Sequence, residues 1–214
     1  MALPFSEPAF LDLFGLYNQA LWPLVAGAWL VSLAVAIRAW RRPGAGGSVL
    51  VLLAAHWLWS GVVYHWLYFR AINPAAVVFA GLFVAQGGLF AWAAATRRAR
   101  FQFDRSPRGR LGLGLVGYGF LYPFLGLWFG LEYPRLPLFL VPCPTTLITA
   151  GFLLASSGLP RVANLVPILW TVIGGSAAVL LGIRADLALL AAGALLALAT
   201  VAPRMFAIRT QHAD

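Results

Sequence analysis

The chain is a succession of long apolar stretches separated by short polar or basic breaks. A helix needs about 20 apolar residues to cross the hydrocarbon core of a bilayer. Seven stretches meet that length, at residues 18–40, 48–69, 74–96, 111–130, 137–157, 163–183 and 186–203. The pattern predicts an all-α membrane protein, a bundle of seven transmembrane helices that forms one integral membrane domain over residues 1–214.

A shorter pattern precedes the first stretch. Ser6 has the type and position of a helix N-cap, and Pro8 suits the first turn that follows it. Large apolar side chains then recur at helical spacing, at Phe10, Leu13, Phe14 and Tyr17. We interpret residues 6–17 as a short interfacial helix with this stripe turned toward lipid. An irregular N-terminal tail is the alternative.

Composition excludes an ordinary soluble domain. Hydrophobic residues make up 62% of the chain and charged residues only 10%, and the mean hydropathy is +0.86. A soluble domain carries about 25% charged residues. A chain of this length could not hide so much apolar surface from water, so the lipid bilayer is the expected partner.

The basic residues give a direction to the predicted bundle. All 15 are arginines, and they lie in short clusters between apolar stretches. With the N-terminus outside and the C-terminus cytoplasmic, the inner loops hold Arg38, Arg41, Arg42, Arg97, Arg98, Arg100, Arg105, Arg108, Arg110, Arg161, Arg204 and Arg209. The outer loops then hold Arg70, Arg135 and Arg184. This asymmetry is typical of the positive-inside rule and argues against a nucleic-acid surface.

Polar side chains gather toward the outer halves of the predicted spans. Polar groups inside a bilayer are costly, so their positions point to function. The candidate ligand-binding residues are Tyr64, His65, Asn73, Glu132, Cys143, Thr145 and Thr146. They predict an outward-facing polar pocket.

Two prolines interrupt the fifth stretch inside its apolar run. Pro142 and Pro144 lack N–H donors and push the preceding residues out of helical geometry. We expect residues 136–142 to be extended and a helix to begin near Pro144, with Cys143 at its cap. Free N–H groups at Thr145 and Thr146 would then face a cavity and favour an anion or a carbonyl. Alternatively, the two prolines end an external loop and the true span is shorter.

The second stretch carries two histidines. His56 and His65 are nine residues apart and face opposite sides of one helix, so they do not form a joint metal or haem site. His56 is interpreted as a core histidine with Ser60 one turn away as a possible partner. His65 is expected to pair with Glu132 or Asp186 across the outer cavity, as a proton-responsive pair. No metal site is predicted.

Several short motifs together resemble a known family. They are Pro4-Phe5, Tyr17-Asn18, Trp22-Pro23, Tyr64-His65, Ile72-Asn73-Pro74-Ala75-Ala76, Pro142-Cys143-Pro144-Thr145-Thr146, Leu169-Trp170, Ile173-Gly174-Gly175-Ser176-Ala177-Ala178 and Asp186-Leu187. With these motifs the chain resembles a family of bacterial multi-pass membrane proteins classed as a domain of unknown function. The resemblance implies a bacterial inner-membrane location and supplies no activity.

Three function classes remain open from the sequence. The first is a protein that binds or transports a small molecule or ion through the outward-facing pocket. The second is a non-catalytic accessory subunit that contacts other membrane subunits or a second copy of the chain. The third is a haem- or quinone-linked membrane protein. Gln86 is the only strongly polar residue near the middle of the third stretch, which favours a one-sided pocket over a pore. An enzymatic role is the less favoured interpretation. The sequence does not identify a cofactor.

Overall fold

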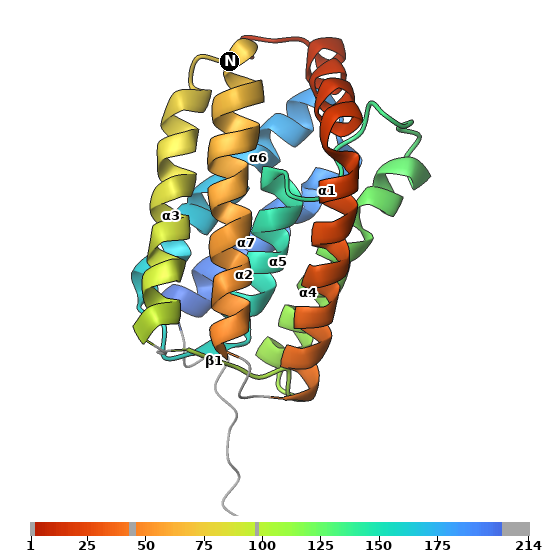
Figure 1. The fold of residues 1–214 in the computed structure, drawn as a ribbon. Helices are drawn as coiled ribbons and strands as arrows, with labels where there is room; N and C mark the ends of the chain where they lie inside the picture. Colours follow the sequence, from red (N-terminus) through yellow and green to blue (C-terminus); the bar gives the residue numbers. More distant parts are fainter. Residues whose placement is uncertain (1–2, 43–45, 97–98, 203–214) are drawn as a thin grey trace, which may run out of the picture.

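The protein is an up-and-down bundle of α-helices, seen in a computed structural model that describes residues 3–42, 46–96 and 99–202 (Figure 1). Its α-helices are α1 (Glu7–Arg41), α2 (Gly46–Trp59), α3 (Ala76–Thr96), α4 (Pro107–Trp128), α5 (Pro142–Leu154), α6 (Leu165–Leu181) and α7 (Ala188–Val201). We call the end at which α1 begins the upper end, as drawn in Figure 1, and the opposite end the lower end.

Short elements join or extend these helices. The second helix continues through a π-helical segment, η1 (Ser60–Tyr68), and a 3₁₀ turn, η2 (Phe69–Ala71). Two further 3₁₀ turns, η3 (Arg161–Asn164) and η4 (Arg184–Leu187), lead into α6 and α7. At the lower end, strand β1 (Arg100–Phe101) pairs antiparallel with strand β2 (Ser156–Ser157).

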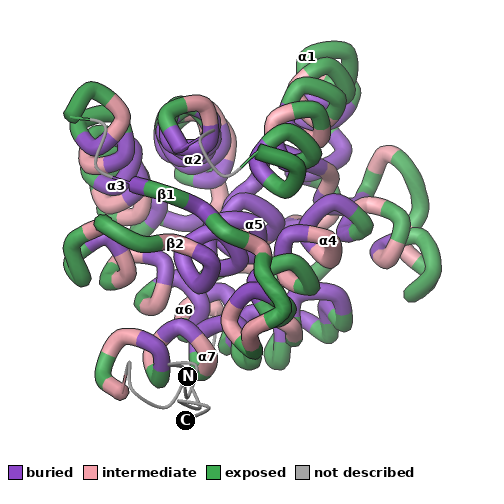
Figure 2. The backbone as a smooth tube through the Cα atoms, turned by 90° about the horizontal axis from the view of Figure 1, so that it is seen from below, coloured by how far each residue is buried: buried purple, intermediate pink, exposed green. Residues whose placement is uncertain are grey.

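Among the described residues, six helices are long and apolar enough to cross a membrane. Within the described part of the chain they are Glu7–Arg41, Gly46–Ala71, Ala76–Thr96, Pro107–Trp128, Arg161–Leu181 and Arg184–Val201. Their outward faces carry many exposed apolar side chains, among them Leu24, Leu30 and Val179, while the exposed positions surround a buried centre (Figure 2). Such a surface suits lipid and not water.

The prediction that residues 137–157 form a full-length transmembrane helix is wrong. Helix α5 has 13 residues, which corresponds to about 20 Å, short of the ~30 Å hydrocarbon core. It stands in the middle of the bundle against α2, α4, α6 and α7, and all its residues except Cys143 are buried. The apolar run that predicted a span is therefore explained by protein neighbours on every side.

An irregular segment, residues 131–141, leads from α4 into α5. Non-helical backbone at membrane depth needs protein partners for its polar groups. Asn18 Nδ2 donates to the carbonyls of Pro134 and Leu136, both at 2.7 Å, and Ser60 Oγ donates to the carbonyl of Leu140 at 3.0 Å. Leu140 has a positive φ of 61°, a conformation that L residues rarely adopt. Side chains of α1 and η1 thus hold this segment in place.

The prediction of a separate interfacial helix at the N-terminus is wrong. Residues 7–41 form one continuous helix, although its N-cap is Ser6 as predicted, with Ser6 Oγ accepting from the Ala9 N–H at 3.4 Å. The expected lipid-facing stripe instead faces the bundle, because Phe10, Leu13, Phe14 and Tyr17 are at most 9% exposed. Helical spacing identifies an apolar face but does not tell lipid from protein, since both are apolar.

The arginines are unequally distributed between the two ends of the bundle. The helix ends and connections at the lower end hold Arg38, Arg41, Arg42, Arg100, Arg105, Arg108, Arg110 and Arg161, and the connections at the upper end hold Arg70, Arg135 and Arg184. The predicted inner residues Arg97, Arg98, Arg204 and Arg209, and residue 203 at the end of the last stretch, lie outside the described residues. The grouping of basic residues expected from the sequence is therefore present in the described part of the fold.

Candidate functional site

A cavity of about 390 Å³ lies in the upper half of the bundle, between α1, η1, α3, α5 and α6. Seven aromatic side chains contribute to its wall: Phe5, Phe10, Phe14, Tyr64, Phe69, Phe79 and Trp170. Many of these rings contact one another, for example Phe14 with Tyr64 at 5.6 Å and Phe79 with Trp170 at 5.4 Å between ring centroids. The volume falls in the range of about 300–1,000 Å³ that small-molecule pockets occupy.

The cavity opens on the outer face of α6. Val172, Ser176 and Leu180 line it at one-turn spacing, and all three are exposed. The Ser176 hydroxyl is bonded within its own helix, to the carbonyl of Val172 at 2.7 Å. The exposed side of the cavity is therefore almost entirely apolar.

A carboxyl group is the one charged lining group. Asp186 is 4% exposed, and Tyr122 Oη donates a hydrogen bond to its Oδ1. The Cys143 thiol lies beside this carboxyl group. A phenol from α4, a thiol from α5 and a carboxyl from η4 thus meet in the interior.

The turn between α6 and α7 places Asp186 in the interior. Gly182 ends α6 with a φ of 69°, a left-handed conformation that glycine adopts without steric cost. The chain then reverses, and the Asp186 N–H donates to the carbonyl of Ile183 at 3.0 Å. Tyr118 Oη donates to the carbonyl of Ala185 at 2.9 Å, which ties the turn to α4.

Close packing of α4 against α5 brings Tyr122 and Cys143 to the same place. A Cβ added at Gly151 would lie 2.6 Å from the carbonyl oxygen of Gly112, and one added at Gly119 would lie 2.4 Å from Ile148. Only glycine allows the two backbones to come this near, as in other membrane helix pairs. The glycines of α4, together with Gly151, therefore position the side chains around Asp186.

The start of α5 differs in detail from the predicted ligand cradle. The predicted break is present, but α5 begins at Pro142, with Val141 as its N-cap. The Thr145 N–H is not free, because it donates to the carbonyl of Val141 at 3.2 Å. Thr145 and Thr146 are both buried, and neither side chain lines the cavity. The predicted anion cradle is therefore wrong, while Cys143 at the same helix start does line the cavity.

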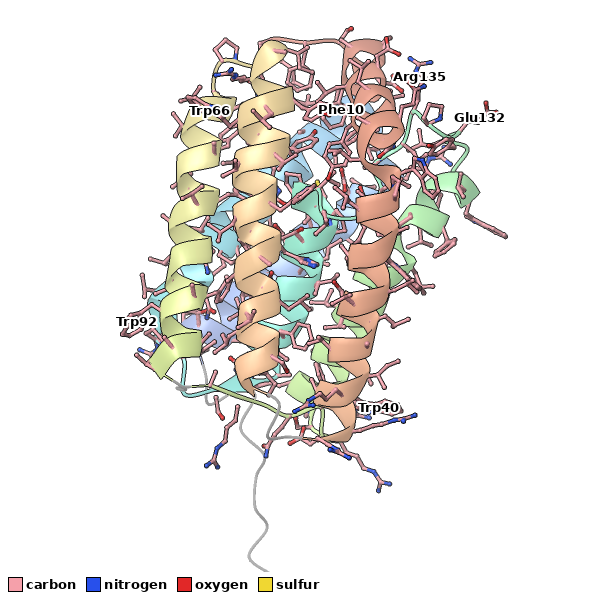
Figure 3. The ribbon with its side chains drawn as sticks, in the orientation of Figure 1. Phe10, Trp40, Trp66, Trp92, Glu132 and Arg135 are labelled. Carbon is pink, nitrogen blue, oxygen red and sulfur yellow. The ribbon has the colours of Figure 1, made fainter. Side chains whose placement is uncertain are left out.

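His65 lies directly behind the cavity wall. Five aromatic rings surround its imidazole: Tyr64, Phe69, Phe79, Phe83 and Trp170, with centroids 4.7–5.8 Å away. Both ring nitrogens are buried without a hydrogen-bond partner. The expected pairing with Glu132 or Asp186 is absent from the structure. Glu132 is exposed on the loop after α4 and points away from the bundle (Figure 3).

The other polar candidates have structural partners. His56 Nε2 lies 2.9 Å from Ser32 Oγ, which itself donates to the carbonyl of Ala28, so the serine accepts from the imidazole. Ser60, the predicted partner of His56, bonds Leu140 instead. Gln86 Nε2 donates to the carbonyl of Ala163 at 3.0 Å and ties α3 to η3. These residues hold helices together and lie away from the cavity.

The structure thus brings together part of the predicted pocket. Tyr64, Asn73 and Cys143 line the cavity, and His65 lies behind its wall. Asn73 also caps the start of the third helix, since its Oδ1 accepts from the Ala75 N–H at 3.1 Å. Sequence reasoning missed Tyr122 and Trp170, and treated Asp186 only as a partner for His65. The isolated acid in an apolar stretch was the available signal.

A second hollow, the α1–α4 groove, lies on the other side of the bundle. It measures about 480 Å³ and is lined by Trp22, Val25, Ala26, Trp29, Leu30, Pro123, Phe124, Leu127, Tyr133, Leu136, Leu138 and Phe139. The Trp29 indole N–H donates to the carbonyl of Phe120 at 3.1 Å, below this surface. No charged side chain lines the groove.

Across residues 3–42, 46–96 and 99–202, no three His, Cys, Asp or Glu side chains group as metal ligands would. Neither the curated proteins nor the solved structures contain a match to the chain. A family model does match, over residues 7–212. The chain belongs to that family, which is described as a family of unknown function, DUF6064.

Proposed function

We propose that this protein is an integral membrane protein that binds a small molecule in the upper cavity. In this proposal the upper end faces outward and the lower end faces the cytoplasm of a bacterial inner membrane. The grouping of arginines at the lower end supports that orientation by the positive-inside rule.

The observation that carries the proposal is the position of Asp186. An ionisable side chain inside a membrane bundle is costly, and such groups mark ligand or ion sites. Asp186 is buried beside Tyr122 and lines the cavity. If its role were to tie helices together, the tyrosine bond would suffice and the adjoining space would be filled by side chains.

A pocket fits the interior better than a pore. The cavity lies in the upper half, and below it the centre of the bundle is occupied by α5, whose buried residues include Leu147, Ile148 and Phe152. Gln86, the polar residue at mid-depth in α3, donates a hydrogen bond to the carbonyl of Ala163. The proposed role is therefore binding from one side.

The test is to fill the cavity and ask whether ligands still bind. Ala177 lines the cavity, and Ala177→Phe would occupy its space; Ala26→Phe in the α1–α4 groove is the matched control. Small molecules are screened by thermal unfolding of the full chain in maltoside micelles, because a ligand of the folded state raises the midpoint. We expect compounds that stabilise the unchanged protein and Ala26→Phe but not Ala177→Phe. Equal stabilisation of Ala177→Phe, or no stabilising compound, would contradict the proposal.

A further inference from the structure

The charge that lines the cavity is of one sign, negative. Asp186 is its one charged lining residue, and no arginine or histidine lines it. The neighbours of the carboxyl group are neutral, since the Tyr122 hydroxyl donates a hydrogen bond to it and the Cys143 thiol lies beside it. In the described part of the chain the one ion pair joins Arg135 and Asp12, which are both exposed. The protein itself therefore places no countercharge beside Asp186.

The aromatic wall has the complementary property. The face of an aromatic ring carries partial negative charge and attracts cations, and pockets that recognise ammonium groups are built from such rings. Phe69, Phe79 and Trp170 line the cavity, and Tyr64 adds a fourth ring. Trp170 also interacts with the sulfur of Cys143, which neighbours Asp186, yet its indole N–H makes no hydrogen bond of ordinary geometry. The rings and the carboxyl group thus both favour a cation in the cavity.

The mouth constrains the rest of the ligand. It opens on the lipid-facing side of α6 between Val172 and Leu180, which are 57% and 58% exposed. A molecule that enters there comes from the bilayer and must carry an apolar body. An anionic head would meet a carboxylate in a region of low dielectric, which is strongly unfavourable. A purely apolar molecule would leave Asp186 without a countercharge.

We propose that the cavity binds an amphipathic organic cation, with its ammonium head between Asp186 and the aromatic wall and its apolar body toward α6. This inference rests on the proposed function and names the class of ligand for the same cavity. Entry is lateral, from the lipid phase past Val172, Ser176 and Leu180.

The experiment compares two probes that differ only in charge. They are phenylpropyltrimethylammonium and its neutral analogue, in which carbon replaces nitrogen. Binding to the full chain in uncharged maltoside micelles is measured by titration calorimetry, with protein-free micelles as the blank. We expect the cation to bind at least about tenfold more tightly than the analogue, as a desolvated cation–π site requires.

Two variants test where that preference comes from. Asp186→Asn keeps the size and the acceptor for Tyr122 but removes the charge, and should abolish the preference for the cation while leaving binding of the analogue unchanged. Asp12→Asn, at an exposed upper-end carboxylate, should leave both affinities unchanged. If Asp186→Asn does not fold, Trp170→Leu removes a ring face and should weaken the cation severalfold more than the analogue.

The outcomes separate this inference from the proposed function. Equal affinities for the two probes, both lost in Ala177→Phe, would overturn the cation inference and leave a ligand-binding cavity in place. A cation preference that survives in Asp186→Asn and in Trp170→Leu would also overturn it. Binding of both probes that persists in Ala177→Phe would contradict the cavity as the site and the proposed function with it.

Discussion

The upper cavity and the α1–α4 groove are two apolar hollows of similar size with different chemistry. They measure about 390 and 480 Å³, and each is lined in part by exposed apolar side chains, Val172 and Leu180 in the cavity and Trp22 and Leu30 in the groove. The cavity contains a buried carboxyl group, a thiol and an amide, from Asp186, Cys143 and Asn73. The groove contains none of these; its Tyr133 is 55% exposed and its Trp29 indole N–H is bonded to Phe120.

The difference shows which observations carry function in a membrane bundle. Apolar volume at a lipid-facing surface costs little, because an acyl chain fills it as well as a side chain does. A buried polar group has no such substitute, and the fold must provide it with partners. Asp186 is held by η4, α4 and α5 together, whereas a lipid tail is enough to fill the groove.

The largest effect is expected where α4 and α5 touch. Gly151→Leu would place a side chain against the backbone of Gly112 and Val116 and force the helices apart. We expect the free energy of unfolding to fall by about 3 kcal/mol, as for other overpacked cores, with loss of the contact between Tyr122 and Asp186. Thermal unfolding in maltoside measures the change.

Gly114→Leu is the matched control, because a Cβ at Gly114 meets nothing within 4 Å. It should leave the unfolding midpoint nearly unchanged. An equal loss in both variants would mean that α4 and α5 are not held by this close approach.

Two tyrosines offer the next contrast. Tyr122→Phe removes the donor to the buried carboxyl group of Asp186, and should lower the free energy of unfolding by about 2 kcal/mol. Tyr133→Phe removes an exposed hydroxyl beside the groove and should change it by less than about 0.5 kcal/mol. Chemical unfolding of both variants provides the comparison. A neutral Tyr122→Phe would show that its bond to Asp186 contributes nothing to stability.

The apolar stretches placed the helices well, because hydropathy reports on removal of side chains from water. Helices Gly46–Ala71 and Ala76–Thr96 lie close to the predicted stretches 48–69 and 74–96. The same signal failed for α5, since a helix surrounded by protein is as apolar as one surrounded by lipid. It failed for the stripe from Phe10 to Tyr17 for the same reason.

The site was harder to predict, because it depends on which loops fold inward. The sequence places Glu132 and Asp186 in similar connections, yet the loop after α4 carries Glu132 outward and the tight turn at Gly182 carries Asp186 inward. Pro142 and Cys143 did indicate a broken helix at the pocket. Tyr122 was hidden in a helix rich in aromatic residues, and only the crossing of α4 and α5 gives it a role.

The single cysteine allows the two hollows to be compared chemically. Cys143 lines the cavity and is partly exposed. We expect a small neutral maleimide to label it, and Ala177→Phe to slow labelling by about tenfold because access controls thiol reactivity. Ala26→Phe, which fills the groove, should leave the rate unchanged. Mass spectrometry of timed samples measures the rate. Equal slowing by both substitutions would show that the thiol is not reached through the cavity.

The orientation of the cavity is tested with the same thiol in intact cells. A membrane-impermeant reagent added outside should label Cys143 in the proposed topology, with the upper end outward. An introduced cysteine at Ser157, exposed at the lower end, should react only after the membrane is opened. The reverse pattern would contradict the orientation.

The smallest effects are expected for two tryptophans, and they sharpen the contrast most directly. Trp29→Phe removes a hydrogen bond from the indole to the carbonyl of Phe120, so it should cost about 1 kcal/mol of unfolding free energy. Trp170→Phe keeps an aromatic ring in the cavity wall and breaks no hydrogen bond of ordinary geometry, so its cost is confined to lost ring packing and should be the smaller of the two. In the groove the tryptophan is a structural hydrogen-bond donor, whereas in the cavity wall the tryptophan contributes its ring and its N–H makes no such bond. A loss in Trp170→Phe larger than that in Trp29→Phe would mean that the indole of Trp170 contributes more to the stability of the fold than the hydrogen-bonded indole of Trp29.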